Sequence, residues 1–236
     1  MSDRFFVLGF ATISGQFVLM RISALIILLL CLASPQTWGA AALVEVKPAH
    51  LSESEKSDVA RIEKYLNELK SVSANFLQVN DSGQFRHGTI AIQRPGKMRV
   101  NYDAPQKDFI IADGSFVHIW DAEMEQKTSV PVGSSIAEFI LRDPLKFEGD
   151  VTITRYARYP AKLELSLVST TDPGDGELTL IFEDKPLQLR QWRVVDAQGR
   201  TTGVNLENAR EGVTFASNMF DFVPPNLGNS NKNRPK

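Results

Sequence analysis

The sequence predicts a mainly β protein with a few helices, an α+β fold whose long antiparallel sheet curls until it nearly closes. Short apolar runs separated by turn residues fill most of the chain, and its 236 residues include twelve prolines and fifteen glycines. Apolar and polar residues alternate within many runs, which indicates strands with one dry and one wet face. About eleven strands with tight links favour an antiparallel meander whose interior is wider than side chains fill easily. A β-sandwich with a solid core fits the same alternation equally well.

The N-terminal segment has the pattern of an export signal. The run RISALIILLLCL, from Arg21 to Leu32, places an apolar stretch behind a single positive charge. Small residues at 39–42 resemble a peptidase site, so we expect cleavage after about Ala41. The run is well short of the ~20 apolar residues that a spanning anchor needs. We therefore assign residues 1–41 to a cleaved signal peptide and prefer Met20, directly before the positive charge, as the true start.

The remaining composition argues against several classes of protein. The only cysteine, Cys31, lies inside the predicted signal, so we expect neither a disulfide nor a thiolate metal site in the exported chain. A net charge of −2 gives no support to a nucleic-acid partner. His50, His87 and His118 lie outside any metal-binding or catalytic motif, so we expect no metal, no cofactor and no enzymatic activity. His118 is the best candidate among them, and a structural hydrogen bond is its favoured interpretation.

The segment LSESEKSDVARIEKYLNELK, which follows the signal, is predicted to form an amphipathic helix. Ser52 and Glu55 have the spacing of a capping box, which places the start of the helix near Ser52. Such a helix must lie on the sheet to bury its apolar stripe. The stripe consists of residues spaced at i, i+3, i+7 and i+10, namely Val59, Ile62, Leu66 and Leu69.

After Val72 the spacing changes to that of extended chain, and turn sequences such as D-S-G, R-P-G and D-P-G separate the runs. A second, short helix is predicted from Ser135 to Leu141, in the longer interval between the sixth and seventh strands. The predicted strands lie near 72–80, 84–94, 97–103, 107–112, 115–121, 124–130, 150–157, 161–169, 176–184, 187–196 and 200–208.

A curled sheet of this length with helices across its mouth would enclose an apolar cavity, and the natural guest of such a cavity is an acyl chain. We expect side chains from the dry faces of the strands and from the second helix to line it. They are Phe76, Ile90, Ile92, Met98, Val100, Tyr102, Ile111, Val117, Ile119, Trp120, Ile136, Phe139, Ile140, Leu163, Leu165, Leu180 and Phe182.

Four segments, taken in order, resemble the LolA family of periplasmic lipoprotein carriers. They are SANFLQ, GTIAIQRPGKMRVNYDAPQ, FIIADGSFVHIWD and FDFVPP, and the resemblance covers about 72–225. It implies an unclosed antiparallel β-barrel of about eleven strands with a helical lid. It also implies a soluble, monomeric carrier in the periplasm. That carrier would take triacylated lipoproteins from an ATP-driven exporter in the inner membrane and deliver them to the outer membrane, where a receptor is a further possible partner.

The resemblance also assigns a role to Arg94, which matches the arginine that binds the lid backbone and holds the family's cavity shut when empty. A surface arginine beside a turn proline is the alternative interpretation. At Met98 and Val100 the chain departs from the family, which often has an aromatic residue and a tryptophan there, so core packing is an equal interpretation. Arg86, Arg94, Lys97 and Arg99 also form a possible basic patch, although scattered solvated charge is the commoner arrangement.

Residues 42–225 are accordingly assigned to a lipoprotein-carrier domain, and 226–236 to a flexible C-terminal tail. A periplasmic lipid or glycolipid shuttle, or an envelope-stress sensor, on the same fold is the alternative function.

Overall fold

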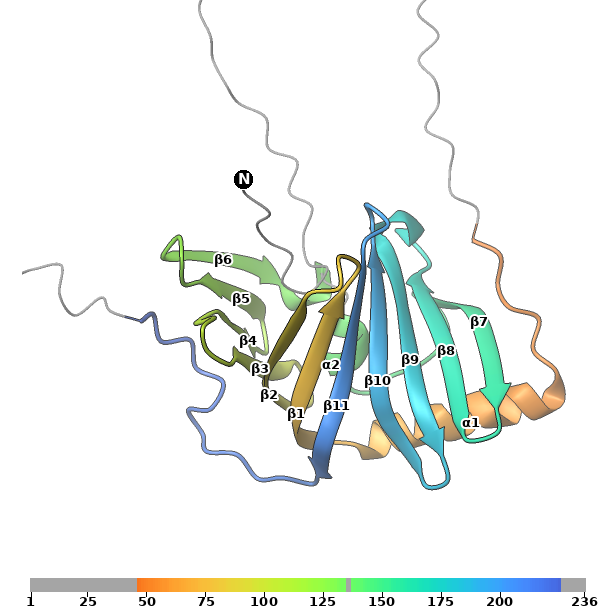
Figure 1. Cartoon of the computed structure of the whole chain (residues 1–236). Helices are drawn as coiled ribbons and strands as arrows, with labels where there is room; N and C mark the ends of the chain where they lie inside the picture. Colours follow the sequence, from red (N-terminus) through yellow and green to blue (C-terminus); the bar gives the residue numbers. More distant parts are fainter. Residues whose placement is uncertain (1–45, 135–136, 226–236) are drawn as a thin grey trace, which may run out of the picture.

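A computed structural model describes residues 46–134 and 137–225, and a single antiparallel sheet of eleven strands dominates it (Figure 1). The predicted signal peptide and C-terminal tail lie outside these residues. Every predicted strand is present with its ends shifted by a few residues. The strands are β1 (Ser71–Asn80), β2 (Phe85–Gln93), β3 (Lys97–Tyr102), β4 (Phe109–Asp113), β5 (Phe116–Asp121), β6 (Gln126–Pro131), β7 (Val151–Tyr159), β8 (Lys162–Ser169), β9 (Gly176–Asp184), β10 (Leu187–Asp196) and β11 (Thr201–Glu211).

The sheet consists of two meanders joined in its middle. Its strand order is β6-β5-β4-β3-β2-β1-β11-β10-β9-β8-β7, so the first strand pairs with the last, and β6 and β7 form the two edges. Because these edges do not pair, the sheet is not closed, and the α+β prediction of an unclosed antiparallel sheet is confirmed. All eleven strands belong to one sheet, so the β-sandwich alternative is wrong.

Helix α1 (Glu53–Glu68) forms where the apolar stripe predicted it. Its N-cap is Ser52, and Ser52 and Glu55 make both reciprocal hydrogen bonds of the capping box. The helix lies across the ends of β7 to β10, opposite the turns that join β1 to β2 and β10 to β11 (Figure 1). Its buried side includes Ile62 and Leu66. The ring of Tyr65 packs edge to face against Phe182 of β9, with ring centroids 6.1 Å apart.

The second helix is shorter than predicted. The chain leaves β6 through a 3₁₀ turn, η1 (Val132–Ser134), and then forms α2 (Glu138–Leu141) before it reaches β7. Residues 135–136, which the prediction included, lie outside the described residues. Ala137 and Leu141 are buried, so the segment packs into the sheet interior and does not sit on its surface.

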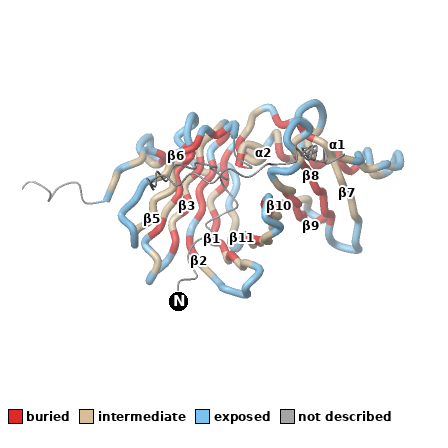
Figure 2. The backbone as a smooth tube through the Cα atoms, turned by 90° about the horizontal axis from the view of Figure 1, so that it is seen from above, coloured by how far each residue is buried: buried red, intermediate tan, exposed pale blue. Residues whose placement is uncertain are grey.

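The outer face of β3 to β5 is covered by the chain that follows β11. Arg99 donates a hydrogen bond to the carbonyl oxygen of Met219 at 3.2 Å, and the ring of Phe222 lies 5.7 Å from Phe109 and 5.1 Å from His118. Figure 1 shows this segment running back past β1 toward β4. In Figure 2 the buried residues follow the strands, and the exposed residues gather at the turns. Both faces of β4 are therefore buried, the inner face by the core and the outer face by the segment after β11.

This arrangement corrects two predicted cavity residues, Ile111 and Trp120. Ile110 pairs with Ile119 on the inner face, whereas Trp120 pairs with Phe109 on the outer face, where the two rings stack at 6.2 Å. Ile111 is fully buried but lies outside the main core, opposite Ile110 in the pleat. Both residues therefore belong to the outer contact, and their assignment to the cavity was wrong.

Gly88 permits a close approach of strands and rings inside the sheet. A Cβ atom at this position would lie 2.1 Å from the carbonyl oxygen of Asn101 and 2.8 Å from the ring of Phe76. Gly88→Ala should therefore lower the free energy of unfolding by about 1–3 kcal/mol, measured by urea denaturation. Gly203→Ala in β11 is the matched control, because its Cβ would meet no atom closer than 3.6 Å. Equal stability of the two variants would contradict this account.

Candidate functional site

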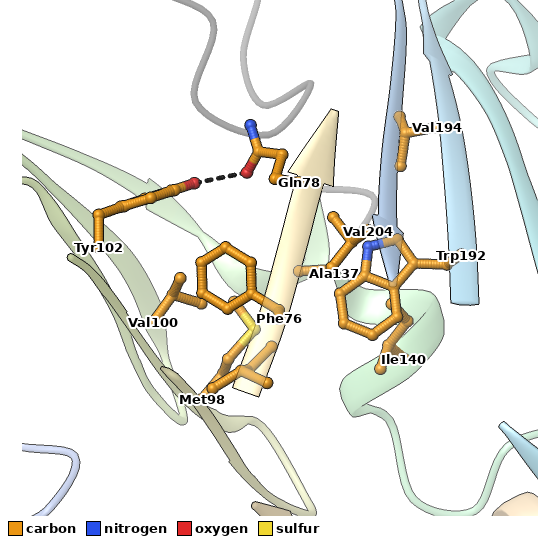
Figure 3. Close-up of a pocket in the computed structure, with 11 residues that line it drawn as sticks. Phe76, Gln78, Met98, Val100, Tyr102, Ala137, Ile140, Trp192, Val194 and Val204 are labelled. Atoms are coloured by element: carbon orange, nitrogen blue, oxygen red, sulfur yellow. Dashed lines mark hydrogen bonds between the residues drawn. The ribbon is translucent and has the colours of Figure 1, made fainter. Parts of the chain in front are cut away.

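An apolar cavity lies between the sheet and α2, and we call it the barrel cavity (Figure 3). It has a volume of about 470 Å³, part of which is open to solvent, and β1, β2, β3, β10 and β11 form its walls. Figure 3 shows the side chains of Phe76, Met98, Ile140 and Trp192 converging on it. The full lining is Phe76, Gln78, Ile90, Met98, Val100, Tyr102, Ala137, Ile140, Trp192, Val194 and Val204.

A second cavity lies beneath the C-terminal half of α1, and we call it the α1 cavity. The space between its atoms is about 460 Å³, part of which is open to solvent, and it is also mainly apolar. Ile140 of α2 lines both cavities and is the one residue that their linings share. Displacement of α2 would therefore widen both cavities. The lining of the α1 cavity is Tyr65, Leu66, Leu69, Ser71, Val72, Ile92, Arg94, Ile140, Leu189, Leu206, Ala209 and Glu211.

Arg94 connects the C-terminal ends of the two helices. Its guanidinium donates to the carbonyl oxygen of Arg142 after α2, with the Nε to oxygen distance at 2.9 Å, and to the carbonyl oxygens of Leu66 and Leu69 at the end of α1. The residue is only 7% exposed. Burial lowers the pKa of Arg94, against the opposing charge of Asp143, but an arginine side chain remains protonated in proteins. One fixed cation thus satisfies carbonyls that the helix ends leave unpaired.

Further hydrogen bonds join the C-terminal half of α1 to the segment around α2. The side-chain amide of Asn67 donates to the carbonyl oxygen of Leu145 at 2.9 Å and accepts from its N–H at 2.8 Å. Lys70 forms an ion pair with Asp143 at 2.7 Å. Gly96, in the turn after Arg94, donates its N–H to the carbonyl oxygen of Leu141 at 2.9 Å. The two helices and the β2–β3 turn are therefore held as one unit over the cavities.

The N-terminal half of α1 is held differently, by a charged network that the sequence analysis missed. Asp58 accepts hydrogen bonds from Arg158, from Arg61 at 3.1 Å and from the Tyr156 hydroxyl at 2.6 Å. Asp184 of β9 accepts from Arg61 at 2.6 Å and from Arg158 at 3.2 Å. Burial alone would raise the pKa of Asp58, but its bonds to Arg158, Tyr156 and Arg61 outweigh this and lower it. The hydrogen bond from Arg61 lowers the pKa of Asp184.

The predicted cavity residues fall into several groups. Phe139 packs at the edge of the core beneath the guanidinium of Arg142, and Ile136 lies outside the described residues. Core residues that line neither cavity are Val117, Leu163, Leu165, Leu180 and Phe182, and the partly buried Ile119 packs against the core. Those that line at least one of the two cavities are Phe76, Ile90, Ile92, Met98, Val100, Tyr102 and Ile140. Lining residues that the prediction missed in the barrel cavity are Gln78, Ala137, Trp192, Val194 and Val204.

His118 lies on the outer face and has a partner at each ring nitrogen. Nδ1 lies 2.9 Å from the hydroxyl of Ser129, and Nε2 lies 2.9 Å from a carboxylate oxygen of Asp113. Burial alone would raise the pKa of Asp113, but hydrogen bonds from Phe116, Ser115 and His118 hold it below its usual range. Within the described residues, no group of three or more His, Cys, Asp or Glu side chains is placed to hold a metal ion. No helix in the described ranges is long and apolar enough to cross a membrane.

The four predicted basic residues do not form a single patch. Arg94 lies in the interior, and Arg86 points to the same side of β2 as Ile90. Arg99 lies on the outer face, where it contacts Met219. The pleat of the strands therefore separates these charges.

The family model and the carrier proteins among the relatives similar in sequence indicate one family. Residues 67–223 match the family model described as outer membrane lipoprotein carrier protein LolA. The chain is 27% identical over 182 residues to an outer-membrane lipoprotein carrier protein of Methylococcus capsulatus, covering 74% of this chain and 87% of the relative. It is also 27% identical over 189 residues to the protein of that name from Pseudomonas syringae pv. syringae, covering 75% and 88%. A solved LolA superfamily protein from Nitrosomonas europaea is 10% identical, with a TM-score of 0.39 over 68% of this chain and 96% of that one.

Proposed function

Since this chain belongs to the LolA family of outer membrane lipoprotein carrier proteins, we propose that it carries lipoproteins across the periplasm with their acyl chains in the barrel and α1 cavities. One observation carries the proposal: Arg94 joins two helices that roof two apolar cavities, and Ile140 of α2 lines both. Such a roof can open as a unit, and its opening would enlarge both cavities.

In the proposed cycle the helices move when cargo binds, and the small size of the cavities supports this step. The space of about 470 Å³ between the atoms of the barrel cavity includes open solvent, so its enclosed part is smaller still. Three long acyl chains need more room than this, so α1 and α2 must shift away from the sheet. The residues of the core beneath α1, such as Leu165 and Leu180, would then become part of the binding surface.

The energy of binding must be offset for delivery to occur. Burial of each CH₂ group contributes about 0.8 kcal/mol, so three acyl chains would contribute tens of kcal/mol in principle. Cargo bound with that affinity would not leave. In the proposed cycle, reclosure of the helices restores the bonds of Arg94 and the apolar contacts of Ile140, and this gain lowers the net affinity for cargo.

The proposal includes the periplasm as the site of action and an inner-membrane exporter as the donor of cargo. It includes no catalytic role. Export and signal cleavage are expected from the N-terminal sequence, and the exporter and a possible outer-membrane receptor are expected from the family.

Co-purification tests this proposal directly. The full chain, recovered from the periplasm of its native host, should carry triacylated polypeptides that mass spectrometry detects. Free phospholipid or glycolipid in their place would overturn it in favour of a lipid shuttle. Absence of any acylated molecule would also overturn it.

A variant that fills the barrel cavity supplies the control for that experiment. Ala137 lines the cavity and is 3% exposed, so Ala137→Phe should occupy it and reduce the recovered lipoprotein severalfold. Ala161 is exposed in a turn, and Ala161→Phe should leave recovery unchanged. Circular dichroism of both variants distinguishes a filled cavity from an unfolded protein. Equal recovery with the two variants would count against the cavity as the binding site.

A further inference from the structure

Two residues that line the mainly apolar barrel cavity, Gln78 and Tyr102, belong to a polar cluster, which we call the polar rim. It consists of Gln78, Arg86, Tyr102 and Asp108. Gln78 and Tyr102 line the cavity and are 3% and 7% exposed. The Tyr102 hydroxyl donates to the side-chain oxygen of Gln78 at 2.8 Å, as Figure 3 shows. Gln78 and Arg86 flank the turn between β1 and β2, at the end of the sheet opposite α1 (Figure 1).

Arg86 supplies an unused donor at this rim. Its Cζ lies 5.7 Å from the centre of the Tyr102 ring, and its side chain is 20% exposed. Nη1 lies 3.8 Å from a carboxylate oxygen of Asp108, which is too far for a hydrogen bond. The same nitrogen is buried and makes no hydrogen bond to any described residue. A buried donor on a charged group is costly to leave unpaired, so this nitrogen is available to an acceptor on a ligand.

The charges around Arg86 select the kind of acceptor. Asp108 is 9% exposed, and one of its carboxylate oxygens accepts the N–H of Ala122 at 3.0 Å. The nearby carboxylate balances the guanidinium, so the rim has no net positive charge to offer an anion. A phosphate placed beside Arg86 would also lie close to Asp108 and be repelled by it. A neutral ester or amide carbonyl accepts the free N–H without that repulsion.

We propose that Arg86, Tyr102 and Gln78 form a subsite for the neutral ester and amide carbonyls that join acyl chains to the head of a lipidated ligand. The subsite would set the orientation of the cargo, with its tails directed toward Ile140 and its polypeptide outside the rim. This inference rests on the proposed function and narrows its ligand class to acylated heads without a phosphate next to their ester and amide carbonyls, in preference to anionic phospholipids, whose phosphate would lie beside Asp108.

Arg86→Met tests the subsite, because methionine keeps an unbranched apolar side chain and removes every donor. The purified full chain would be titrated with a synthetic triacylated lipopeptide and, separately, with diphenylhexatriene, a hydrocarbon probe that has no carbonyl. The variant should bind the lipopeptide about tenfold more weakly, the effect of one hydrogen bond to a charged donor, and bind the hydrocarbon unchanged. Arg86→Lys retains a donor and should recover part of the loss.

Several outcomes would overturn the inference. Equal weakening for both ligands would show that Arg86 only supports the fold, and no weakening for either would show that it has no role in binding.

Wild-type protein that binds phosphatidylglycerol as tightly as the lipopeptide would contradict the selection against anions. Asp108→Asn should improve binding of phosphatidylglycerol, and failure to do so would contradict the role of Asp108. If wild-type protein binds no acylated ligand at all, the proposed function itself fails, which is a different result from each of these.

Discussion

Replacing Arg94 with leucine should slow the release of acylated cargo by about 10- to 100-fold. The guanidinium bonds to the carbonyl oxygens of Leu66 and Arg142 stabilise the closed arrangement of α1 and α2. Hydrogen bonds to a charged group contribute about 1.5–3 kcal/mol, and each 1.4 kcal/mol corresponds to a factor of ten. Closure of the helices over the empty cavities competes with bound cargo. Destabilising the closed state therefore shifts the equilibrium toward the open state with cargo bound.

Two substitutions at Arg94 separate the effect of its hydrogen bonds from the effect of its side-chain volume. Leucine keeps part of the apolar stem that packs beneath α1, and Arg94→Lys keeps the charge but cannot reach both helices, so its effect should be intermediate. Arg190 is exposed and paired with Glu183, so Arg190→Leu should leave release unchanged. Transfer of a fluorescent lipopeptide to acceptor vesicles gives the rate. A release rate of Arg94→Leu equal to that of wild type would rule out a role of Arg94 in holding α1 and α2 closed.

Sequence reasoning succeeded where partners are close along the chain. Met98 and Val100 face the cavity because β3 forms a hairpin with β2, and their register follows from a short turn. The capping box at Ser52 is equally local. For Ile111 the same reasoning failed, because both faces of β4 are apolar and the segment that covers the outer face follows β11. The local sequence pattern does not show which face of β4 packs against the cavity side and which packs against the segment after β11.

The missed residues depend on contacts between distant parts of the chain. Trp192 and Val204 alternate with polar neighbours as lining residues should, but they enter the cavity only because β1 pairs with β11. The distant partners of Asp58 are Tyr156 and Arg158 of β7, and Arg61 bridges Asp58 to Asp184 of β9. No helical pattern can indicate these contacts. Arg86 was grouped with Arg94, Lys97 and Arg99 as a possible basic patch or scattered surface charge, whereas Arg86 lies on the inner side of β2 and Arg99 on the outer side of β3. In each case the fold class was predictable and the pairing that builds the site was not.

Replacing Asp58 with asparagine should lower the free energy of unfolding by about 2–3 kcal/mol, measured by urea denaturation at pH 7. Its carboxylate is 10% exposed and binds two arginines, whose side chains are 40% and 48% exposed. Loss of the carboxylate leaves these cations without one partner, and their exposure keeps the cost below that of a fully buried pair. Glu183→Gln breaks an exposed ion pair with Arg190 and should change stability by less than about 1 kcal/mol.

The same network predicts how stability depends on pH. The pKa values of Asp58 and Asp184 are lowered in the folded protein, so both groups contribute stability that is present above the unfolded Asp pKa of about 4. That contribution is lost as the pH falls below 4 through the lowered folded values. Acidification should therefore destabilise wild-type protein more than Asp58→Asn, and equal destabilisation of the two would contradict the network.

A comparison of the two variants identifies which end of α1 moves. Arg94 holds the C-terminal half of the helix and Asp58 holds the N-terminal half, at separate sites on one rigid element. If the helix pivots about the charged network, Asp58→Asn should reduce stability while cargo release stays close to the wild-type rate. Arg94→Leu should change the rate of cargo release strongly and change the free energy of unfolding less than Asp58→Asn does. A release rate altered equally by both substitutions would mean that α1 leaves the sheet as a whole.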